Sequence, residues 1–171
     1  MALSYTHIMT TNLVSQTNLV SLTSIPQTYT DLLLKLSVRT NRDLDGFGDM
    51  LIRFNSSSTS DYRNVMIQGN GSTSGGSTST TDNCIYYVLA SSVPSNSYFF
   101  NNGELLVPNY AGNKYKSIQA TNVAERNTST GIVRIHAGVY PYTTAVSSID
   151  ISDGNGAYMQ PYSKFSLYGV H

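Results

Sequence analysis

The acidic segment of residues 41–49 carries the side chains best suited to metal chemistry. It reads NRDLDGFGD, with side-chain oxygens at its first, third, fifth and ninth positions, which are Asn41, Asp43, Asp45 and Asp49. This spacing resembles the start of a calcium-binding loop, where a glycine at the sixth position allows a sharp turn. The twelfth position is Ile52, where such loops have a bidentate glutamate. A hairpin turn at Asp45-Gly46 is the simpler interpretation, and we expect no bound metal.

The sequence contains no recognisable set of residues for catalysis. The three histidines, His7, His136 and His171, lack metal-ligand spacing, and no Gly-x-Ser-x-Gly motif marks a nucleophilic serine. Glu104 and Glu125 are the only glutamates, whereas glycoside hydrolysis needs two positioned carboxylates. We therefore expect a protein without enzymatic activity or cofactor. We expect His136 to lie half-exposed on a strand.

Charged residues are scarce in this chain of 171 residues. Ten Lys or Arg balance ten Asp or Glu, and the first 30 residues contain none of these four types. Nucleic-acid binding depends on cations against phosphates, and no apolar run is long enough to span a bilayer, so we expect neither partner. The absence of Lys and Arg through Thr30 also argues against a signal peptide. We therefore expect synthesis in a cytoplasm without export.

Alternating apolar and polar residues predict β-strands along most of the chain, and these strands must position any site. Residues 31–40 place Leu32, Leu34, Leu36 and Val38 on one face, although a helical stripe through Leu32, Leu33 and Leu36 competes with this interpretation. Further runs follow, separated by Asp-Gly, Asn-Gly and Gly-Asn turns at intervals of roughly 10 to 16 residues. The pattern predicts an all-β fold, namely a two-sheet β-sandwich of jelly-roll type with eight to ten strands and little or no helix.

Two segments differ from this pattern. Residues 1–24 are uncharged, and we expect them to form either ordinary first strands or an extended arm that adds to a neighbour's sheet. Residues 70–83 are of low complexity, and we expect a surface loop within a single domain of residues 25–171. The candidate interface residues are apolar side chains of the first segment and late tyrosines: Ile8, Leu13, Val14, Leu19, Val20, Tyr140, Tyr142, Tyr158 and Tyr162.

Four stretches of the sequence resemble a known group of proteins. They are SIPQTYTDL at 24–32 leading to LSVRTN at 36–41, LIRFN at 51–55 with DYR at 61–63, VPNYAGNKYKS at 107–117, and SKFSLYGV at 163–170. Together they resemble small structural proteins in the virions of tailed bacteriophages. The resemblance covers residues 24–170 and implies a non-enzymatic β-sandwich on the particle, of the capsid-decoration or tail-associated type. It carries over no catalytic residues.

The expected function is capsid decoration. In this role a homotrimer on the outer shell would cement major capsid subunits, or contact other virion proteins, through the apolar first segment and the tyrosines. The first alternative is a tail or fibre module that binds host surface glycans through tyrosines and Asn/Ser/Thr loops. A hydrolase acting on surface polysaccharide is the second. For the structural roles, we expect the virion surface as the location, after synthesis in the host cytoplasm.

Overall fold

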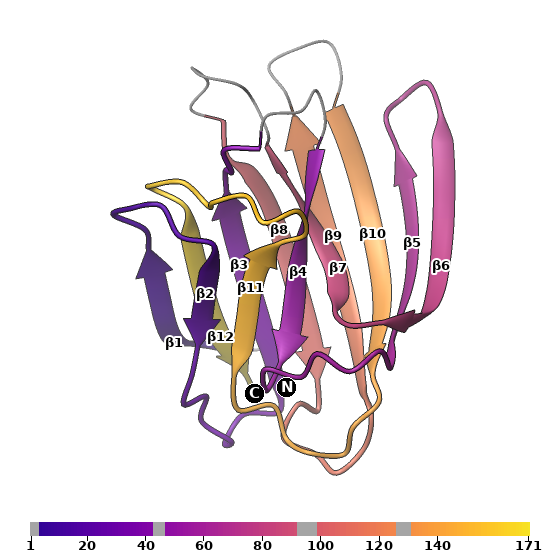
Figure 1. The fold of residues 1–171 in the computed structure, drawn as a ribbon. Coiled ribbons are helices and arrows are strands. Elements are labelled where there is room, and N and C mark those ends of the chain that lie inside the picture. Colours follow the sequence, from indigo (N-terminus) through magenta and orange to yellow (C-terminus); the bar gives the residue numbers. More distant parts are fainter. Residues whose placement is uncertain (1–3, 43–46, 92–98, 126–130) are drawn as a thin grey trace.

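All regular secondary structure in the described part of the chain is β-strand. The computed structural model describes residues 4–42, 47–91, 99–125 and 131–171 (Figure 1). Its strands are β1 (Tyr5–Asn12), β2 (Leu19–Leu22), β3 (Asp31–Val38), β4 (Phe47–Phe54), β5 (Tyr62–Gly69), β6 (Ser74–Asp82), β7 (Ile85–Ser91), β8 (Asn101–Pro108), β9 (Lys116–Glu125), β10 (Gly131–Tyr140), β11 (Ile149–Asp153) and β12 (Lys164–Val170). The prediction of an all-β fold is confirmed.

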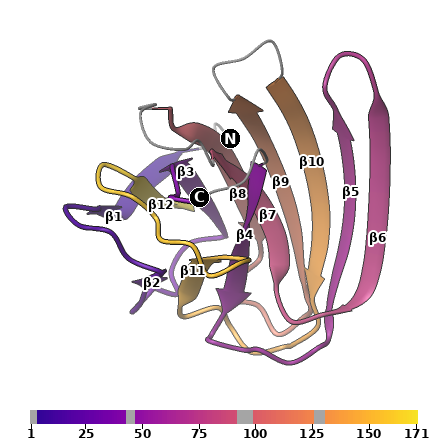
Figure 2. The same ribbon diagram turned by 45° about the horizontal axis from the view of Figure 1, so that its top comes forward.

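The strands form two antiparallel sheets. The larger sheet has the order β1-β12-β3-β8-β9-β10-β5-β6, and the smaller has the order β2-β11-β4-β7 (Figures 1 and 2). Without β5, β6, β9 and β10, the larger sheet has the order β1-β12-β3-β8, and the smaller sheet keeps the order β2-β11-β4-β7. When these eight strands are numbered along the chain, the two orders are 1-8-3-6 and 2-7-4-5. This is the strand order of a jelly roll, so the predicted two-sheet sandwich is confirmed.

Two hairpins are inserted into this jelly roll. The β5–β6 hairpin follows β4, and the β9–β10 hairpin follows β8. Both add to the larger sheet beside β8, and β5 and β6 lie beyond β7 at the right-hand side of Figure 1. The described residues thus form twelve strands instead of eight to ten. The difference arises because residues 1–24 and 70–83 contribute strands that the sequence pattern did not assign.

Residues 70–83 are not a surface loop, and that prediction is wrong. The backbone N–H of Asn70 donates to the carbonyl of Thr73 (3.1 Å) across a tight turn in which Gly71 has a φ of 86°. The chain then returns along β5 as β6, with Ser74 opposite Gly69. Low complexity did not prevent pairing because Ser and Thr side chains fit a pleated strand and a two-residue turn sets the hairpin register.

Residues 1–24 are not an extended arm, because their strands pair within the same chain. β1 pairs with β12, and β2 pairs with β11. Val20 is buried, and Ile8 and Leu13 are half-buried against the core. Of the two alternatives for this segment, the first-strand interpretation is correct. The folded domain therefore includes this segment instead of beginning at residue 25.

The main hydrophobic core is built from alternate residues of the strands. Leu34 and Leu36 of β3 belong to it, as do Ile52 and Phe54 of β4, and all four are buried. Burying one such side chain contributes about 1.5–3 kcal/mol. The strand interpretation of residues 31–40 is confirmed, since β3 pairs with β12 on one side and with β8 on the other.

Asn55 clamps the end of β4 to the segment before β11. Its Oδ1 accepts hydrogen bonds from the N–H groups of Ser147 (2.8 Å) and Ser148 (3.2 Å), and its Nδ2 donates to the carbonyl of Ala145 (2.9 Å). We expect Asn55→Ala to lower the free energy of unfolding by about 2–3 kcal/mol in urea titrations, since four hydrogen bonds are lost, including one from Ser147 Oγ. Asn55→Asp keeps the acceptor and should lose less. Equal stability of all three proteins would show that this clamp does not hold the segment.

Candidate interaction surface

In the middle of β10, two polar side chains point inward and two aliphatic side chains point outward. Arg134 and His136 are 8% and 3% exposed, whereas Val133 and Ile135 are 54% and 45% exposed. The sequence correctly predicts which of these residues share a face of the strand, but the prediction that His136 is half-exposed is wrong. The inward orientation is set by a carboxylate on the opposite sheet, Asp49, which pairs with Arg134.

The outward side chains gather in a patch that we call the aliphatic face. It consists of Val65 and Ile67 on β5, Val123 on β9, and Val133 and Ile135 on β10, each 45–59% exposed. The register places Val133 opposite Val123 and Ile135 opposite Ile67. All five side chains are β-branched and therefore stiff. Little side-chain entropy would be lost if a partner covered them.

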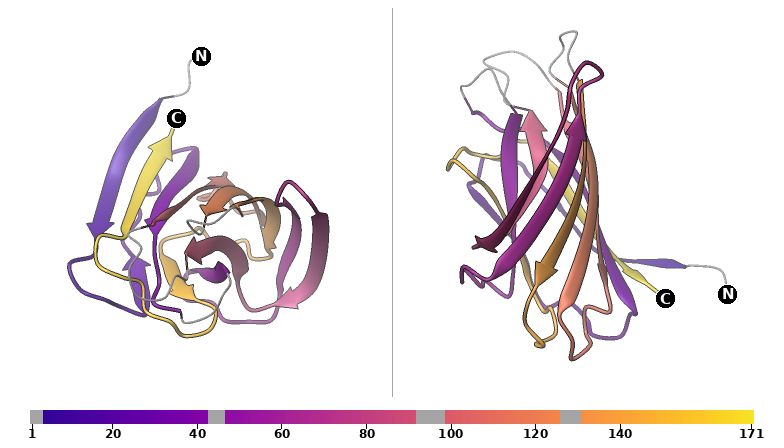
Figure 3. Two further views of the ribbon diagram at one scale, coloured as in Figure 1. Left: turned by 90° about the horizontal axis from the view of Figure 1, so that it is seen from above. Right: turned by 90° about the vertical axis from the view of Figure 1, so that its right-hand side faces the viewer.

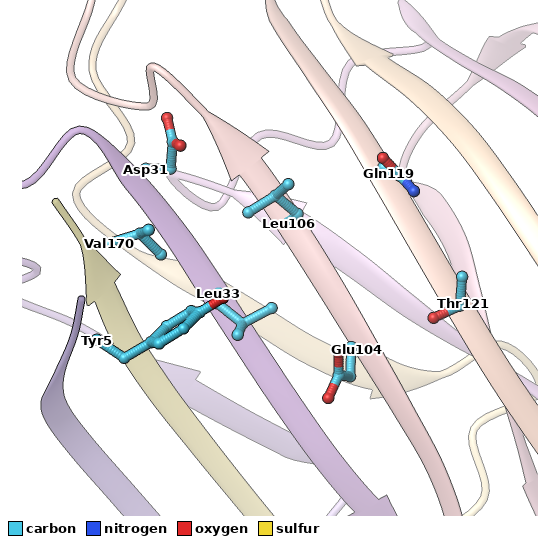
Figure 4. Close-up of a pocket in the computed structure, with 8 residues that line it drawn as sticks. All are labelled: Tyr5, Asp31, Leu33, Glu104, Leu106, Gln119, Thr121 and Val170. Atoms are coloured by element: carbon cyan, nitrogen blue, oxygen red, sulfur yellow. The ribbon is translucent and has the colours of Figure 1, made fainter. Parts of the chain in front are cut away.

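Three open depressions lie on this side of the larger sheet. One, of about 580 Å³, extends from Val133 and Ile135 toward Lys35, and a second, of about 470 Å³, extends from the same two residues toward Gly76. A third, of about 260 Å³, lies farther along the sheet and is lined by Tyr5, Asp31, Leu33, Glu104, Leu106, Gln119, Thr121 and Val170 (Figure 4). This side of the larger sheet is thus a broad surface with shallow hollows, which suits contact with another protein.

An ion pair lies beside one part of the aliphatic face. Nζ of Lys35 on β3 lies 2.8 Å from a carboxylate oxygen of Glu104 on β8, and both side chains are about half exposed. The hydrogen bond that the Lys35 ammonium donates to Glu104, together with the negative charge of that carboxylate, raises the pKa of Lys35 above its ordinary value. A partner that covers this part of the sheet would meet a balanced ion pair instead of a lone charge.

The inner side of the inserted hairpins is packed with polar groups and small residues. Arg134 Nη1 lies 2.6 Å from Asp49 Oδ1 on β4, so this ion pair joins the two sheets. The same guanidinium donates from Nε (3.0 Å) and Nη2 (2.7 Å) to Gln68 Oε1 on β5. A β-carbon on Gly138 would lie 2.6 Å from Ile85 Cδ1, so the glycine allows β7 to approach closely. This polar packing leaves the aliphatic side chains of β10 on the outside.

His136 lies beside this ion pair on the same side of β10. Both of its ring nitrogens are buried and have no hydrogen-bond partner among the described residues. Burial and, to a smaller extent, the positive charge of Arg134 lower the pKa of His136 to about 4, although the negative charge of Asp49 opposes this shift. The ring is therefore neutral at pH 7. A neutral, buried histidine without a positioned acceptor is poorly suited to transfer protons.

Two of the nine predicted interface residues belong to the core, so the prediction is wrong for them, and three more pack partly against it. Val20 and Tyr140 are buried, and Ile8, Leu13 and Tyr142 are half-buried against the core. The Tyr140 ring packs against Phe54 and Tyr142, with ring centroids 5.5 and 5.0 Å apart. These two tyrosines therefore belong to an aromatic cluster within the fold. The other four predicted residues are exposed: Val14, Leu19, Tyr158 and Tyr162.

Two of these exposed residues meet at one end of the sandwich, which we call the loop end. The N–H of Tyr162 donates to the carbonyl of Leu13 (2.7 Å), and the N–H of Leu13 donates to the carbonyl of Ser163 (2.9 Å). These bonds hold the segment after β1 against the segment before β12. Val14 and Tyr162 project there, 92% and 75% exposed. The loop end is thus a second exposed surface.

Two of the four calcium-loop candidates make contacts within the fold. Asn41 Oδ1 accepts a hydrogen bond from the N–H of Tyr158 (2.8 Å), and Asp49 pairs with Arg134. Asp43 and Asp45 lie outside the described residues. Within residues 4–42, 47–91, 99–125 and 131–171, no three His, Cys, Asp or Glu side chains form a metal-binding group. The described residues alone therefore assemble no metal site.

No family model, curated protein or solved structure matches this chain. The described residues also include no helix that is long and apolar enough to cross a membrane. The aliphatic face was missed by sequence reasoning, because the usual apolar-in, polar-out rule predicts the opposite orientation of β10. Val133 and Ile135 alternate with Arg134 and His136, and that rule would place the two aliphatic side chains inside.

Proposed function

We propose that this protein is a non-enzymatic structural component of a phage virion. Its role would be capsid decoration, in which the aliphatic face binds major capsid subunits on the particle surface. The observation that carries the proposal is the exposure of five adjacent β-branched side chains: Val65, Ile67, Val123, Val133 and Ile135. Contiguous exposed apolar patches often mark protein–protein contacts. The resemblance of residues 24–170 to virion proteins supports the same role.

The position of the aliphatic face on the inserted hairpins supports an added function. The jelly-roll order is complete without β5, β6, β9 and β10. These strands extend the sheet, and a cross-sheet ion pair from Arg134 to Asp49 fixes them. A typical stable interface buries about 800 Å² on each partner, with an apolar centre and a polar rim. The aliphatic face can supply the centre, and Thr121, Gln119 and the Lys35–Glu104 pair can supply the rim.

A double substitution on the aliphatic face tests this proposal. Binding of Ile67→Asp/Val133→Asp to particles that lack the protein should be at least tenfold weaker than binding of the parent, because two carboxylates would be desolvated at the contact. Both positions are about half exposed, so the fold should persist in circular dichroism. Val14→Asp at the loop end is the matched control and should bind normally. Unchanged binding by the double variant would refute the role of the aliphatic face.

A tail or fibre module that recognises host glycans is the second candidate, and the loop end favours it. Tyr162 is exposed there beside Val14, and Tyr158 is exposed in the same segment between β11 and β12. Tyrosine combines an apolar ring with a polar tip suited to sugars. If Tyr162→Ala abolishes competition for host adsorption while the double aspartate variant competes normally, this candidate replaces the first. Counting copies per virion separates the two locations. Nothing in the described residues favours the hydrolase alternative.

A further inference from the structure

β6 is a free edge of the larger sheet and takes no part in the core. Its one neighbour in the described sheet is β5, and Figures 1 and 3 show it at the far end from β1. The strand reads SGGSTSTTD and is exposed at seven of its nine positions. It has no apolar side chain to bury, so the larger sheet gains little stability from it in a single molecule. This points to a role outside the single molecule.

The other edge strands carry features that protect against pairing, whereas β6 has none over most of its length. Short strands, bulges and charges are the usual protections. β2 has four residues, the pairing of β1 with β12 shifts register between His7 and Met9, and the pairing of β7 with β4 shifts between Asp49 and Leu51. In β6 the shift falls after Ser79, and residues 74–81 contain no charged residue and no proline.

Hydrogen-bond alternation identifies the free backbone groups of β6. Asn70 donates to Thr73 across the turn, so these two residues form a hydrogen-bonded pair. In an antiparallel ladder, hydrogen-bonded and non-hydrogen-bonded pairs alternate. The N–H and C=O groups of Ser74, Gly76 and Thr78 therefore point away from β5. These groups can form a ladder with a further strand.

We propose that β6 pairs with β6 of a second copy in antiparallel orientation, joining the two larger sheets across a two-fold axis. An antiparallel pair of identical strands is self-complementary, and two-fold dimers are the commonest symmetric assemblies. Charge favours a second copy, because residues 74–81 are uncharged and the whole chain has a formal net charge of zero. Two copies therefore approach without net repulsion.

The aliphatic face adjoins this edge. Thr78 and Gly76 of β6 lie opposite Val65 and Ile67 of β5. Pairing through β6 would therefore place the aliphatic faces of two copies on the same side of one continuous sheet. The dimer does not rest on the proposed virion function and would form without a capsid. It differs from the trimer expected from the sequence, so the mass of the assembly separates the two.

Sedimentation equilibrium of the whole chain tests the pairing. We expect a monomer–dimer equilibrium within a range of concentrations up to about 1 mM, which detects even a Kd near 1 mM. Thr78→Pro removes an outward N–H and leaves the β5–β6 bonds, as edge strands tolerate, and should weaken the dimer at least tenfold. Thr78→Val keeps the N–H and should dimerise like the parent.

A second variant covers the case in which the proline variant does not fold. Thr78→Lys keeps the backbone N–H but places a charge on the pairing edge of each copy, so it should also weaken the dimer. Three results would overturn the pairing: a monomer at every concentration, a trimer, or a dimer unaffected by the folded Thr78 variants. Loss of the dimer in Ile67→Asp/Val133→Asp but not in Thr78→Pro or Thr78→Lys would assign self-association to the aliphatic face and would likewise overturn it.

Discussion

Arg134→Met is expected to lower the free energy of unfolding by about 1.5–3 kcal/mol, because it removes the charge-assisted hydrogen bonds of a buried guanidinium. The side chain of Arg134 is 10% exposed, and its guanidinium binds Asp49 and Gln68 at 2.6–3.0 Å. Methionine fills much of the space but leaves the carboxylate of Asp49 and the amide oxygen of Gln68 without their donor. Asp49 retains partial contact with solvent, which favours the lower end of this range.

The Lys35–Glu104 pair provides a matched control for this substitution. It also joins neighbouring parts of the larger sheet by an ion pair, but both side chains are about half exposed. Exposed pairs contribute about 0–1 kcal/mol, so Lys35→Met should change stability little. Urea titrations of both variants measure the difference. Equal, small losses would show that the polar inner side of β10 does not hold the inserted hairpins to β4.

The second large effect is a loss of stability in mild acid that depends on His136. The ring is neutral and buried in the folded protein, with its pKa lowered from 6.5 to about 4. In the unfolded chain it binds a proton near its ordinary pKa, so acid favours unfolding. The stability that depends on the neutral His136 ring is fully present above pH 6.5 and is lost as the pH falls from 6.5 toward 4. A shift of this size corresponds to about 3 kcal/mol.

Comparing the parent with His136→Gln isolates this effect from the titration of carboxylates. The free energy of unfolding is measured in urea at about pH 7.5 and about pH 4.5, a range in which histidine changes charge. The loss between these two pH values should be smaller in His136→Gln than in the parent. His7→Gln, on the exposed part of β1, should keep the parental loss. Identical losses in parent and His136→Gln would contradict a neutral, buried ring.

The strands and their pairing type could be predicted from the sequence because they depend on local patterns. Leu34, Leu36 and Val38 alternate with polar residues, and β3 forms there with these three side chains buried. Turn residues such as Asn70 and Gly71 end strands at the positions where they occur. A period of two residues and turn chemistry are both short-range signals. These two signals were sufficient to predict an all-β sandwich.

The orientation of β10 and the role of residues 70–83 could not be predicted from such signals. Alternation shows which residues share a face but does not show which face is inside. For β10 that choice depends on Asp49, which lies 85 positions before Arg134 in the sequence. Likewise, a polar, glycine-rich segment becomes β6 because β5 offers it an edge. The aliphatic face follows from the first of these long-range contacts, so it was also missed.

The place of β12 has a consequence for how the chain folds. β12 lies between β1 and β3 and pairs with both, so these two strands cannot be joined in the larger sheet until β12 has been synthesised. Folding dominated by contacts between distant segments is slow, on the order of milliseconds to seconds. During synthesis the facing edges of β1 and β3 have no partner, and nascent copies on neighbouring ribosomes are exposed to mispairing with one another. A lower rate of protein synthesis during expression should therefore raise the yield of soluble protein more than a change of buffer after lysis.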